Sequence, residues 1–344
     1  MDYTKLLDSY GSIIESDLSE LFSRLIKRGE SYHPFMADAY EAAEGFVLRG
    51  GRRLGACSTL MVYKGYTNKI DEAIVKISSG IELYRHSILV HDDIADDETM
   101  RRGGKTLHEA FADGKDAHFG TGSAIFAGNI LYSLAIESVL NSGFDHDRLT
   151  DVLRLISSDY RDINESQMLD LLFEYKEPSV DEWQVMAGKR AASLFRTSML
   201  AGAMPSQAPV KDMRMLEDAA RHIGYAFDIQ DDIIDTFATK EQYGRDPCGD
   251  ITKRKKPLHI IIALERDKRL TSIMKAGTEL TDAKIGEIQE IVRESGALDA
   301  AKSISRDHAK EAQRLITGTG MNDEAKDFFI SFIKYVDESL DWYK

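Results

Sequence analysis

Two acidic clusters with identical spacing are the residues of this chain best suited to chemistry. The first cluster, in HDDIADDETMRRGG, contains Asp92, Asp93 and Asp96. The second cluster, in FDIQDDIIDTF, contains Asp231, Asp232 and Asp235. Residues four apart on a helix face the same way, so the first and last aspartates of each cluster can bind a cation together. Because Mg²⁺ takes one or two carboxylates with water and substrate phosphate, the spacing predicts magnesium ions that hold a diphosphate between the clusters.

A solvated acidic surface is the alternative for either cluster, since the chain carries a net charge of −14. Its Asp-Asp dipeptides, however, all lie inside the two clusters, at 92–93, 96–97 and 231–232. Apolar residues surround both clusters: SILV precedes the first, and isoleucines flank the second. Like charges on a mostly apolar helix repel each other and need a counterion, so the sequence favours a metal site.

Basic residues lie near both clusters. Arg101 and Arg102 follow the first, and RGGRRLG carries Arg52 and Arg53 beside two glycines that let the backbone approach a ligand closely. A cationic run, KRKK at 253–256, follows the second cluster. The planar fork of arginine matches phosphate oxygens. Carboxylates for metal and arginines for phosphate together predict a site that stabilises a departing diphosphate.

Helices must position these groups. Apolar residues recur mostly at spacings of three and four, and clear alternation is missing, which predicts helices throughout. The predicted helices span 2–28, 35–64, 70–100, 122–141, 146–175, 180–203, 210–237, 256–267, 281–293, 297–316 and 322–342. The longest irregular segments, 101–121 and 238–255, each follow one acidic cluster directly. Binding groups often lie on loops at the ends of rigid helices, so this placement predicts a shared site.

The composition predicts a single domain spanning 1–344. At 344 residues and 43% apolar, the chain can bury a large core, and no Gly/Ser-rich or Pro-rich linker divides it. The net charge argues against nucleic acid as a partner, because phosphate backbones need a basic face. Two cysteines without metal-ligand spacing fit a reducing cytoplasm. The acidic N-terminus lacks a signal-peptide pattern, and no run approaches about 18 uncharged apolar residues, so we expect no transmembrane segment.

The ordered set of motifs resembles the trans-prenyltransferase family, the head-to-tail polyprenyl diphosphate synthases, and among them the geranylgeranyl diphosphate synthases. The set comprises Gly50-Gly51-Arg52, residues 91–103, KTLHEAF at 105–111, GKRAASLF at 188–195, GYAFDIQDDIID at 224–235 and GRDPCGD at 244–250. The resemblance implies an all-α, single-domain helical bundle around a deep central cavity, usually as a homodimer. It also implies three Mg²⁺ ions per active site and two substrates, isopentenyl diphosphate and an allylic diphosphate.

The resemblance assigns roles to individual residues. Asp92, Asp96 and Asp231 would be the principal metal ligands, supported by Asp93, Asp232 and Asp235. Arg101 and Lys255 match contacts to the allylic diphosphate, and Arg52 and Arg102 match contacts to isopentenyl diphosphate. Lys189 matches the lysine beside the reacting carbons. Arg245 stands where the family usually has lysine, so the charge is kept.

Four positions depart from the family pattern, in two pairs. An arginine three residues after Arg52 is replaced by Gly55, while the usual His or Gln seven residues before Asp92 is Arg85. We hypothesise that Arg85 supplies the charge missing at position 55. A threonine and a glutamine at the reaction centre are likewise replaced by Arg190 and Asp228. We hypothesise that these two form a charge pair there, since a buried charge without a partner is costly. The residues expected at the reacting centre are therefore Lys189, Arg190, Asp228 and Arg101.

Product length in this family depends on bulky residues below the first cluster on the same helix. Tyr84 lies eight residues before Asp92, about 12 Å deeper at 1.5 Å per residue. Helix geometry puts Ile88 and Tyr84 on roughly the aspartate face. Ser87 falls further round, so its importance comes from the family alone. Because neither 87 nor 88 is aromatic, the resemblance implies a cavity open past the farnesyl length, with Tyr84 as its floor. We expect geranylgeranyl diphosphate as product, with geranylfarnesyl diphosphate as the alternative.

Two other functions compete with this expectation. A terpene cyclase also uses metal-binding carboxylates in a helical cavity, but the basic groups Arg52, Arg85 and Arg102 would then be superfluous. A non-catalytic subunit of a heteromeric synthase would be expected to lose metal carboxylates, whereas this chain keeps both clusters. The sequence therefore favours an active condensing enzyme that accepts a dimethylallyl, geranyl or farnesyl starter.

Overall fold

The computed structural model describes residues 3–240, 247–275 and 280–342, which form two compact units. The first unit comprises residues 1–156, 197–213 and 320–328. The second comprises 157–196, 214–319 and 329–344. Four of the five boundaries fall inside helices, and the fifth, at 319–320, follows the helix Ala297–Gly318. Independent domains, by contrast, usually separate in Pro- or Gly-rich linkers. The prediction of one domain remains a prediction, and each unit is described by itself.

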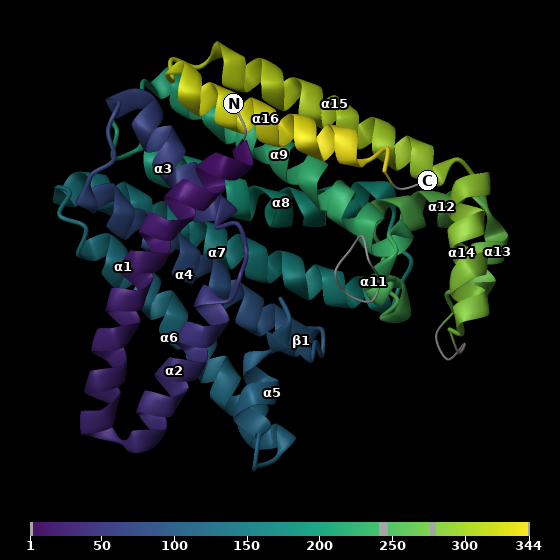
Figure 1. Ribbon diagram of the computed structural model, residues 1–344. Coiled ribbons are helices and arrows are strands. Elements are labelled where there is room, and N and C mark those ends of the chain that lie inside the picture. The colour runs from purple at the N-terminus through teal and green to yellow at the C-terminus, as the bar shows by residue number, and fades with distance from the viewer. Residues whose placement is uncertain (1–2, 241–246, 276–279, 343–344) are drawn as a thin grey trace. The chain divides into compact units, whose positions relative to one another are not determined.

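Helices make up almost all of the regular structure in the described ranges (Figure 1). They are α1 (Tyr3–Tyr32), α2 (Pro34–Leu48), α3 (Leu54–Thr67), α4 (Glu72–Ala95), α5 (Leu107–Ala112), α6 (Ala117–Leu140), α7 (His146–Glu174), α8 (Val180–Ala203), α9 (Val210–Phe237), α11 (Gly249–Thr252), α12 (Leu258–Arg266), α13 (Lys268–Ile273), α14 (Asp282–Glu294), α15 (Ala297–Gly318) and α16 (Asp323–Ser339). The all-α prediction is confirmed, and α8 and α9 have the predicted bounds.

The predicted helix 35–64 is wrong, because two helices occupy this span. The chain leaves the helical conformation at Arg49, and Gly50 and Gly51 have φ values of +52° and +90°. Arg53 is also left-handed, with φ 50°, and precedes the first residue of α3. The left-handed region breaks a right-handed helix and favours glycine. The Gly-Gly pair therefore acts as a helix break, which the apolar periodicity alone did not reveal.

The segment predicted as irregular, 101–121, also contains regular structure. Strands β1 (Met100–Arg101) and β2 (Gly104–Lys105) form a small antiparallel hairpin. Its turn residues, Arg102 and Gly103, have φ values of 51° and 75°, the left-handed pair of a type I′ turn. Helix α4 ends at Ala95 rather than at 100, and α5 and the first turn of α6 occupy the rest of the segment. Two short helices, α11 and α13, were missed as well.

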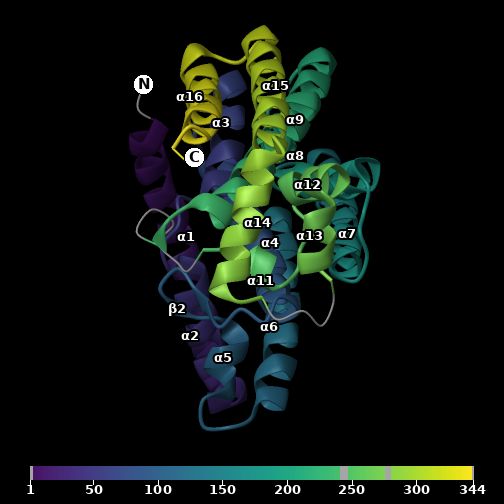
Figure 2. The same ribbon diagram turned by 90° about the vertical axis from the view of Figure 1, so that its right-hand side faces the viewer.

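In the first unit, α4 and α6 pack closely and antiparallel (Figures 1 and 2). A Cβ on Gly80 would come within 2.9 Å of the Ala135 carbonyl oxygen, and one on Gly128 within 2.4 Å of His91 Nε2. Glycine allows this close approach at both crossings, and at Gly80 the atom it approaches belongs to the backbone. Asp71 and Asp116 cap the amino ends of α4 and α6 by accepting backbone N–H groups. The close packing fixes the end of α4 that carries the first acidic cluster.

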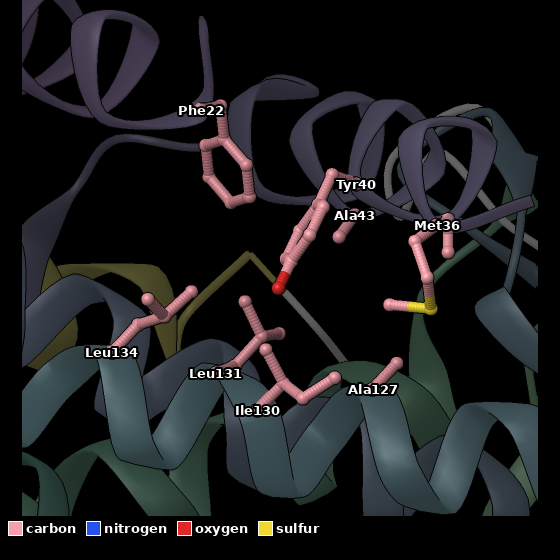
Figure 3. Close-up of a pocket in the computed structure, with 9 residues that line it drawn as sticks. Phe22, Met36, Tyr40, Ala43, Ala127, Ile130, Leu131 and Leu134 are labelled. Carbon is pink, nitrogen blue, oxygen red and sulfur yellow. The ribbon is translucent and has the colours of Figure 1, made fainter. Parts of the chain in front are cut away.

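A small apolar cavity lies between α1, α2 and α6 of the first unit (Figure 3). Its lining side chains include Phe22, Met36, Tyr40, Ile130 and Leu134. A larger groove of about 480 Å³ continues from it past Tyr32 and Glu137. No residue predicted for the active site lines either space.

Helix α6 bears on the expectation that the chain has no transmembrane segment, which stays a prediction. Over the part of the chain that the structure describes, it is the one helix long and apolar enough to cross a membrane. Such a helix is weak evidence, because the core helix of a soluble protein passes the same test. Its outer face carries Ile125 and Phe126, of which Phe126 is 69% exposed.

The second unit is built around α9, whose carboxyl-terminal half carries the second acidic cluster. Helices α12, α13, α14 and α15 pack against one another (Figure 2). Their apolar side chains share a core with Trp183 of α8 and with Ile229 and Ile233 of α9. Ile229 and Ile233 are fully buried, so Asp231, two residues from each, points to the opposite face of α9.

Candidate active site

The first acidic cluster lies at the carboxyl end of α4. Asp92 is part-exposed, whereas Asp93 is buried with its side chain only 1% exposed. Asp96 is the C-cap, and its backbone N–H donates to the Asp92 carbonyl oxygen at 2.8 Å. The two outer aspartates are thus one helical turn apart, as their spacing predicted. Their carboxylates belong to the part-exposed face of the helix.

Arg101 of β1 holds the first cluster from the hairpin side. Its Nε donates to Asp93 Oδ1 at 2.6 Å, and its Nη2 lies 3.5 Å from Asp92 Oδ2. The other oxygen of Asp93, Oδ2, is buried and accepts no hydrogen bond from the described residues. Burial raises the pKa of Asp93 to about 7, although the charge of Arg101 opposes the rise. One arginine therefore does not satisfy this pair of carboxylates.

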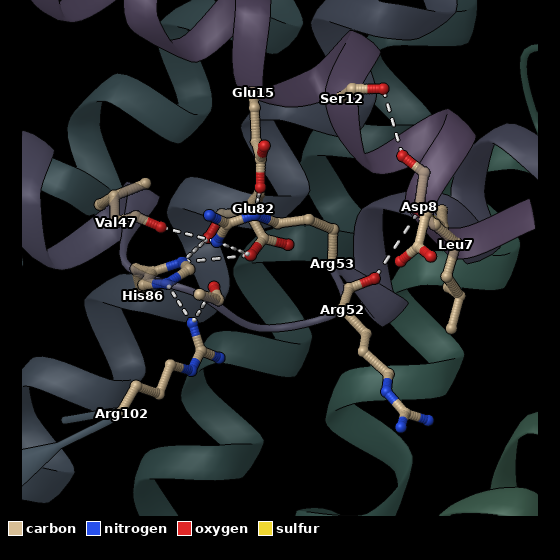
Figure 4. Close-up of polar contacts among 12 residues, drawn as sticks. Leu7, Asp8, Ser12, Glu15, Val47, Arg52, Arg53, Glu82, His86 and Arg102 are labelled. Carbon is tan, nitrogen blue, oxygen red and sulfur yellow. Dashed lines mark hydrogen bonds and ion pairs between the residues drawn. The ribbon is translucent and has the colours of Figure 1, made fainter. Parts of the chain in front are cut away.

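The hairpin is docked on the loop that follows α2. Arg49 Nη1 donates to the carbonyl oxygens of Arg101 at 3.3 Å and Lys105 at 2.8 Å. This contact places Arg102, at the turn, against the Gly50-Gly51 backbone. Arg52 on the same loop is exposed, and its side chain extends away from Arg53 (Figure 4). Two of the predicted diphosphate contacts, Arg52 and Arg102, therefore belong to one loop and hairpin assembly.

Arg53 has a structural role in the first unit. Its buried guanidinium donates to Val47 O at 2.6 Å and to Glu82 and Glu15 at 3.1 Å each (Figure 4). Burial alone would raise the pKa of Glu82, but the charges of Arg53 and Arg85 lower it. This buried pair ties the loop after α2 to α4, the helix that carries the first acidic cluster.

Arg85 lies close enough to Arg102 for their charges to interact. Burial, followed by the charge of Arg85, lowers the pKa of the Arg102 guanidinium to about 10. Gly55 is buried in the first turn of α3 and offers no charge of its own. The hypothesis that Arg85 replaces the charge missing at position 55 stays a prediction, which the charge interaction between Arg85 and Arg102 supports.

The second cluster lies near the carboxyl end of α9, in the second unit. Asp231 is exposed, Asp232 is part-exposed and Asp235 is buried. Asp235 Oδ2 accepts the backbone N–H of Asp250 at 3.1 Å, and its carbonyl oxygen accepts that of Cys248 at 2.7 Å. Asp235 therefore also anchors the segment that leads into α11, in addition to any role as a ligand.

Arg190 of α8 is the cation beside the second cluster. Its Nη2 and Nε donate to Asp228 Oδ2 at 2.9 and 3.2 Å, so the predicted charge pair is confirmed. Its Nη1 donates to Asp170 Oδ1 at 3.3 Å, and Nη2 lies 3.9 Å from Asp232 Oδ2. Burial and then the charge of Asp228 raise the pKa of Asp232 well above its usual range. Asp228 and Asp170 thus hold Arg190 against the acidic cluster.

The two lysines assigned by the resemblance have different surroundings. Lys255 Nζ lies 3.4 Å from Asp170 Oδ2, so it joins the Arg190 network. Lys189 instead bonds Asp162 at 3.1 Å and Glu165, both on α7. Consecutive helical residues point about 100° apart, so Lys189 and Arg190 cannot face the same neighbours. In this structure Arg190 is the residue beside the second cluster, and the assignment of Lys189 to the reacting carbons stays a prediction.

The resemblance did not assign roles to two carboxylates of the second unit. Asp170 bridges Arg190 and Lys255. The sequence could have indicated this residue, because QMLDLLF places a single charge inside an apolar run. Asp250 lies in the motif GRDPCGD, and burial, with the charge of Asp235, raises its pKa to about 7. Arg245, from the same motif, lies outside the described residues.

The carboxylates fit a divalent cation. Asp93 Oδ2 and Asp232 Oδ2 are buried and accept no hydrogen bond in the described ranges, and a buried polar atom without a hydrogen bond is costly. Within the same ranges, no group of three or more His, Cys, Asp or Glu side chains is placed to hold a metal ion unaided. Mg²⁺ typically completes its coordination with water and substrate phosphate, so an incomplete protein ligand set suits this ion.

The residues predicted to set product length lie on α4 as helix geometry requires. Ile88 is part-exposed, like Asp92 one turn later. Tyr84 is almost fully buried, and Ser87 is fully buried. The part-exposed stripe that leads away from Asp92 therefore includes Ile88, while Ser87 lies on the packed side of the helix.

Comparison with known proteins gives concordant matches. Residues 37–294 match the family model described as polyprenyl synthetase. A short chain isoprenyl diphosphate synthase from Methanothermobacter thermautotrophicus is 31% identical over 278 residues, 79% of this chain and 82% of that protein. A geranylgeranyl pyrophosphate synthetase structure from Pyrococcus horikoshii has a TM-score of 0.85 at 25% identity, covering 98% of this chain and 99% of that one. A Corynebacterium glutamicum geranylgeranyl pyrophosphate synthase, complexed with isoprenyl diphosphate and magnesium, has a TM-score of 0.89 at 20% identity, covering 97% and 99%.

Proposed function

The chain belongs to the polyprenyl synthetase family, and we propose that it condenses isopentenyl diphosphate with an allylic diphosphate to give geranylgeranyl diphosphate. One observation carries the proposal: each acidic cluster keeps all its carboxylates and has an arginine beside it. Arg101 lies 2.6 Å from Asp93, and Arg190 lies 3.9 Å from Asp232. Clusters of carboxylate and guanidinium groups suit a reaction in which diphosphate is the leaving group.

Magnesium dependence is part of the proposal. Asp92, Asp96 and Asp231 would hold the ions, three per active site, with Asp93, Asp232 and Asp235 in support. When bound, magnesium neutralises the diphosphate and stabilises it as a leaving group. The buried oxygens of Asp93 and Asp232 that accept no hydrogen bond within the described chain support this assignment.

The remaining charged residues bind and orient the two substrates. Arg101 and Lys255 bind the allylic diphosphate, whose C1–O bond breaks with the electron pair leaving on the diphosphate. Arg52 and Arg102 bind isopentenyl diphosphate, with Arg85 adding charge beside Arg102. The isopentenyl double bond then attacks the allylic C1, and the resulting cation loses a proton to the released pyrophosphate. Lys189 would contribute only after its ammonium leaves Asp162 and Glu165. Arg245, where the family has lysine, is also assigned to substrate binding.

Geranylgeranyl diphosphate is favoured as the product because α4 has no aromatic residue between Tyr84 and Asp92. Tyr84 is buried one turn below Ile88 and suits the floor of a chain-binding cavity. Geranylfarnesyl diphosphate is the alternative product, which would form if the growing prenyl chain extends past Tyr84.

Incubation of the purified chain with magnesium, isopentenyl diphosphate and each of three starters tests the function. Dimethylallyl, geranyl and farnesyl diphosphates should all be extended, and chromatography should show geranylgeranyl diphosphate as the longest main product. Asp92→Asn should reduce kcat about 10²-fold or more, because a metal carboxylate is lost. Hydrocarbon formed from a starter alone would indicate a cyclase, and no product with any starter would indicate a non-catalytic subunit. Either result would overturn the proposal.

We also propose that the chain acts as a homodimer in the cytoplasm. The exposed apolar side chains of Ile125 and Phe126 on α6 support a protein interface. Both cysteines, Cys57 and Cys248, are unpaired and buried, which supports a reducing compartment.

A further inference from the structure

His86 is a buried histidine of α4 that none of the assignments above uses. Its side chain is 1% exposed, and its Nδ1 lies 2.8 Å from the Glu82 carbonyl oxygen one turn earlier. Since a carbonyl oxygen only accepts, Nδ1 carries the proton, and Nε2 is left as an acceptor. Arg102 Nη1 lies 3.3 Å from that Nε2 (Figure 4). The edge of Phe46 packs against the ring at 5.8 Å, which fixes its plane.

Arg102 is held on three sides. Its Nη1 donates to His86 Nε2 and also to the Gly50 carbonyl oxygen, at 3.3 Å each. A Cβ at Gly51 would lie 2.7 Å from the Arg102 Cζ, so the guanidinium rests directly on the glycine backbone. The residue as a whole is nevertheless exposed. One edge of the guanidinium is therefore fixed by the protein, while the side chain remains accessible.

The backbone of Arg102 points to a functional constraint. Arg102 has φ 51° at the first central position of the type I′ turn, where Gly, Asn and Asp are usual. A long cationic side chain gains nothing locally from this strained conformation. The strained conformation does, however, place the guanidinium of Arg102 against Gly51 and His86. This placement explains why the strain is kept.

His86 stays uncharged between its neighbours. Burial lowers its pKa to about 4, and the charges of Arg102 and Arg53 add to the effect against the attraction of Glu82. The carboxylate of Glu82 is already shared with Arg53 at 3.1 Å. A neutral ring can accept the Arg102 hydrogen bond, whereas a protonated ring could not.

We propose that His86 is a positioning residue, which as a neutral acceptor fixes the guanidinium of Arg102 on the Gly50-Gly51 backbone before isopentenyl diphosphate binds. The inference rests on the proposed function, in which Arg102 contacts that substrate. Pre-orientation reduces the ordering cost of binding, so loss of His86 weakens binding of isopentenyl diphosphate and leaves the allylic substrate unaffected.

Steady-state kinetics of His86→Ala and His86→Gln test the inference. Because a hydrogen bond to a charged group is lost, His86→Ala should raise KM for isopentenyl diphosphate about tenfold. Its kcat and its KM for the allylic substrate should stay within about twofold of the wild type. His86→Gln keeps an acceptor near the Nε2 position and should recover most of the affinity. Gly51→Ala, which displaces the guanidinium from the other side, should reproduce the effect of His86→Ala.

Tyr63→Phe is the matched control, since it removes a part-buried hydrogen bond to Asp71 in the same unit without touching Arg102. It should lower the melting temperature and leave both KM values unchanged. Equal rises in both KM values, or no recovery with glutamine, would show that His86 only fills space. If the wild type forms no product, the proposed function fails, and calorimetric titration with isopentenyl diphosphate then decides the inference. Equal affinity of wild type and His86→Ala in that titration would overturn it.

Discussion

At the scale of residues, the structure shows which charged side chains pair with one another, and the sequence pattern does not. Arg190 bonds Asp228 and Asp170, whereas the adjacent Lys189 bonds Asp162 and Glu165, which lie earlier on α7 than Asp170. The pairing of Arg190 with Asp228 replaces two uncharged residues expected from the family pattern. Two changes that form one ion pair need each other, because either charge alone would be left without its counterion.

A double-mutant cycle on Arg190→Gln and Asp228→Asn should therefore show coupling. The side chains are 20% and 19% exposed, so their coupling in the free energy of unfolding should reach about 1 kcal/mol or more. Urea denaturation without magnesium measures it. The pair Arg306–Asp337 in the same unit, with side chains 34% and 42% exposed, is the control and should couple by less than about 1 kcal/mol. Equal coupling in both cycles would contradict a special role for the Arg190 pair.

Arg85 supplies a second prediction at this scale. Arg85→His should raise KM for isopentenyl diphosphate far more than KM for the allylic substrate, because the charge beside Arg102 is removed. Initial rates measured with each substrate varied in turn check this. Equal effects on the two Michaelis constants would refute the hypothesis that Arg85 compensates for Gly55.

At the scale of elements, α4 carries both the first acidic cluster and the residues below it. Tyr84 lies two helical turns before Asp92, so truncating it should open the space that limits the growing chain. We expect Tyr84→Ala to lengthen the main product by at least one isoprene unit, as measured by chromatography. Ile88→Phe is the matched opposite change and should shorten the product. An unchanged distribution in Tyr84→Ala would remove Tyr84 as the floor.

The pairing of α9 and α15 makes stability depend on pH. His222 Nδ1 lies 2.7 Å from His308 Nδ1, and the His308 ring stacks on Tyr225 at 4.8 Å. Burial, followed by the charge of His222, lowers the pKa of His308 to about 4, below the unfolded value near 6.5. The unfolded state therefore binds the proton more readily, so stability is complete above about pH 6.5 and falls toward pH 4.

His308 should account for about 1 kcal/mol of the stability lost between pH 7 and pH 5, allowing for its partial exposure. Melting temperatures across this range test the effect. His308→Phe keeps the stacking on Tyr225 and should flatten the pH dependence. His222, His86 and His259, whose pKa values burial also lowers, add to the slope that remains, whereas Asp93 and Asp250, whose pKa values burial raises to about 7, oppose it. An identical slope in wild type and variant would contradict this role of His308.

At the scale of the whole molecule, the exposed face of α6 should determine assembly. Phe126→Glu should convert the proposed dimer into a monomer near the chain mass of 38.6 kDa, because a charge would be buried in an apolar interface. Light scattering after gel filtration measures the mass. Val210→Glu, at a 70% exposed apolar residue on α9, is the control and should not change the mass. A wild type that is monomeric at micromolar concentration would contradict the homodimer.

The helices could be predicted from the sequence because apolar periodicity and capping residues are local signals. Helices α8 and α9 match their predicted bounds, whereas the predicted helix 35–64 is interrupted at Gly50 and Gly51. That break comes from left-handed backbone conformations, which an apolar pattern does not report. The hairpin at 100–105 was missed for a similar reason, since two residues per strand are too few to show alternation.

The sequence by itself identified the candidate groups for metal and phosphate binding, because the spacing of the aspartates along a helix fixes which of them share a face. Only the tertiary structure decided which cation meets which carboxylate. Adjacent residues on a helix point about 100° apart, so Arg190 reaches Asp228 while Lys189 reaches Asp162. Likewise, His86 meets Arg102 only because a distant loop and hairpin are folded against α4. Such partners lie many residues away in the chain, where no local spacing can specify them.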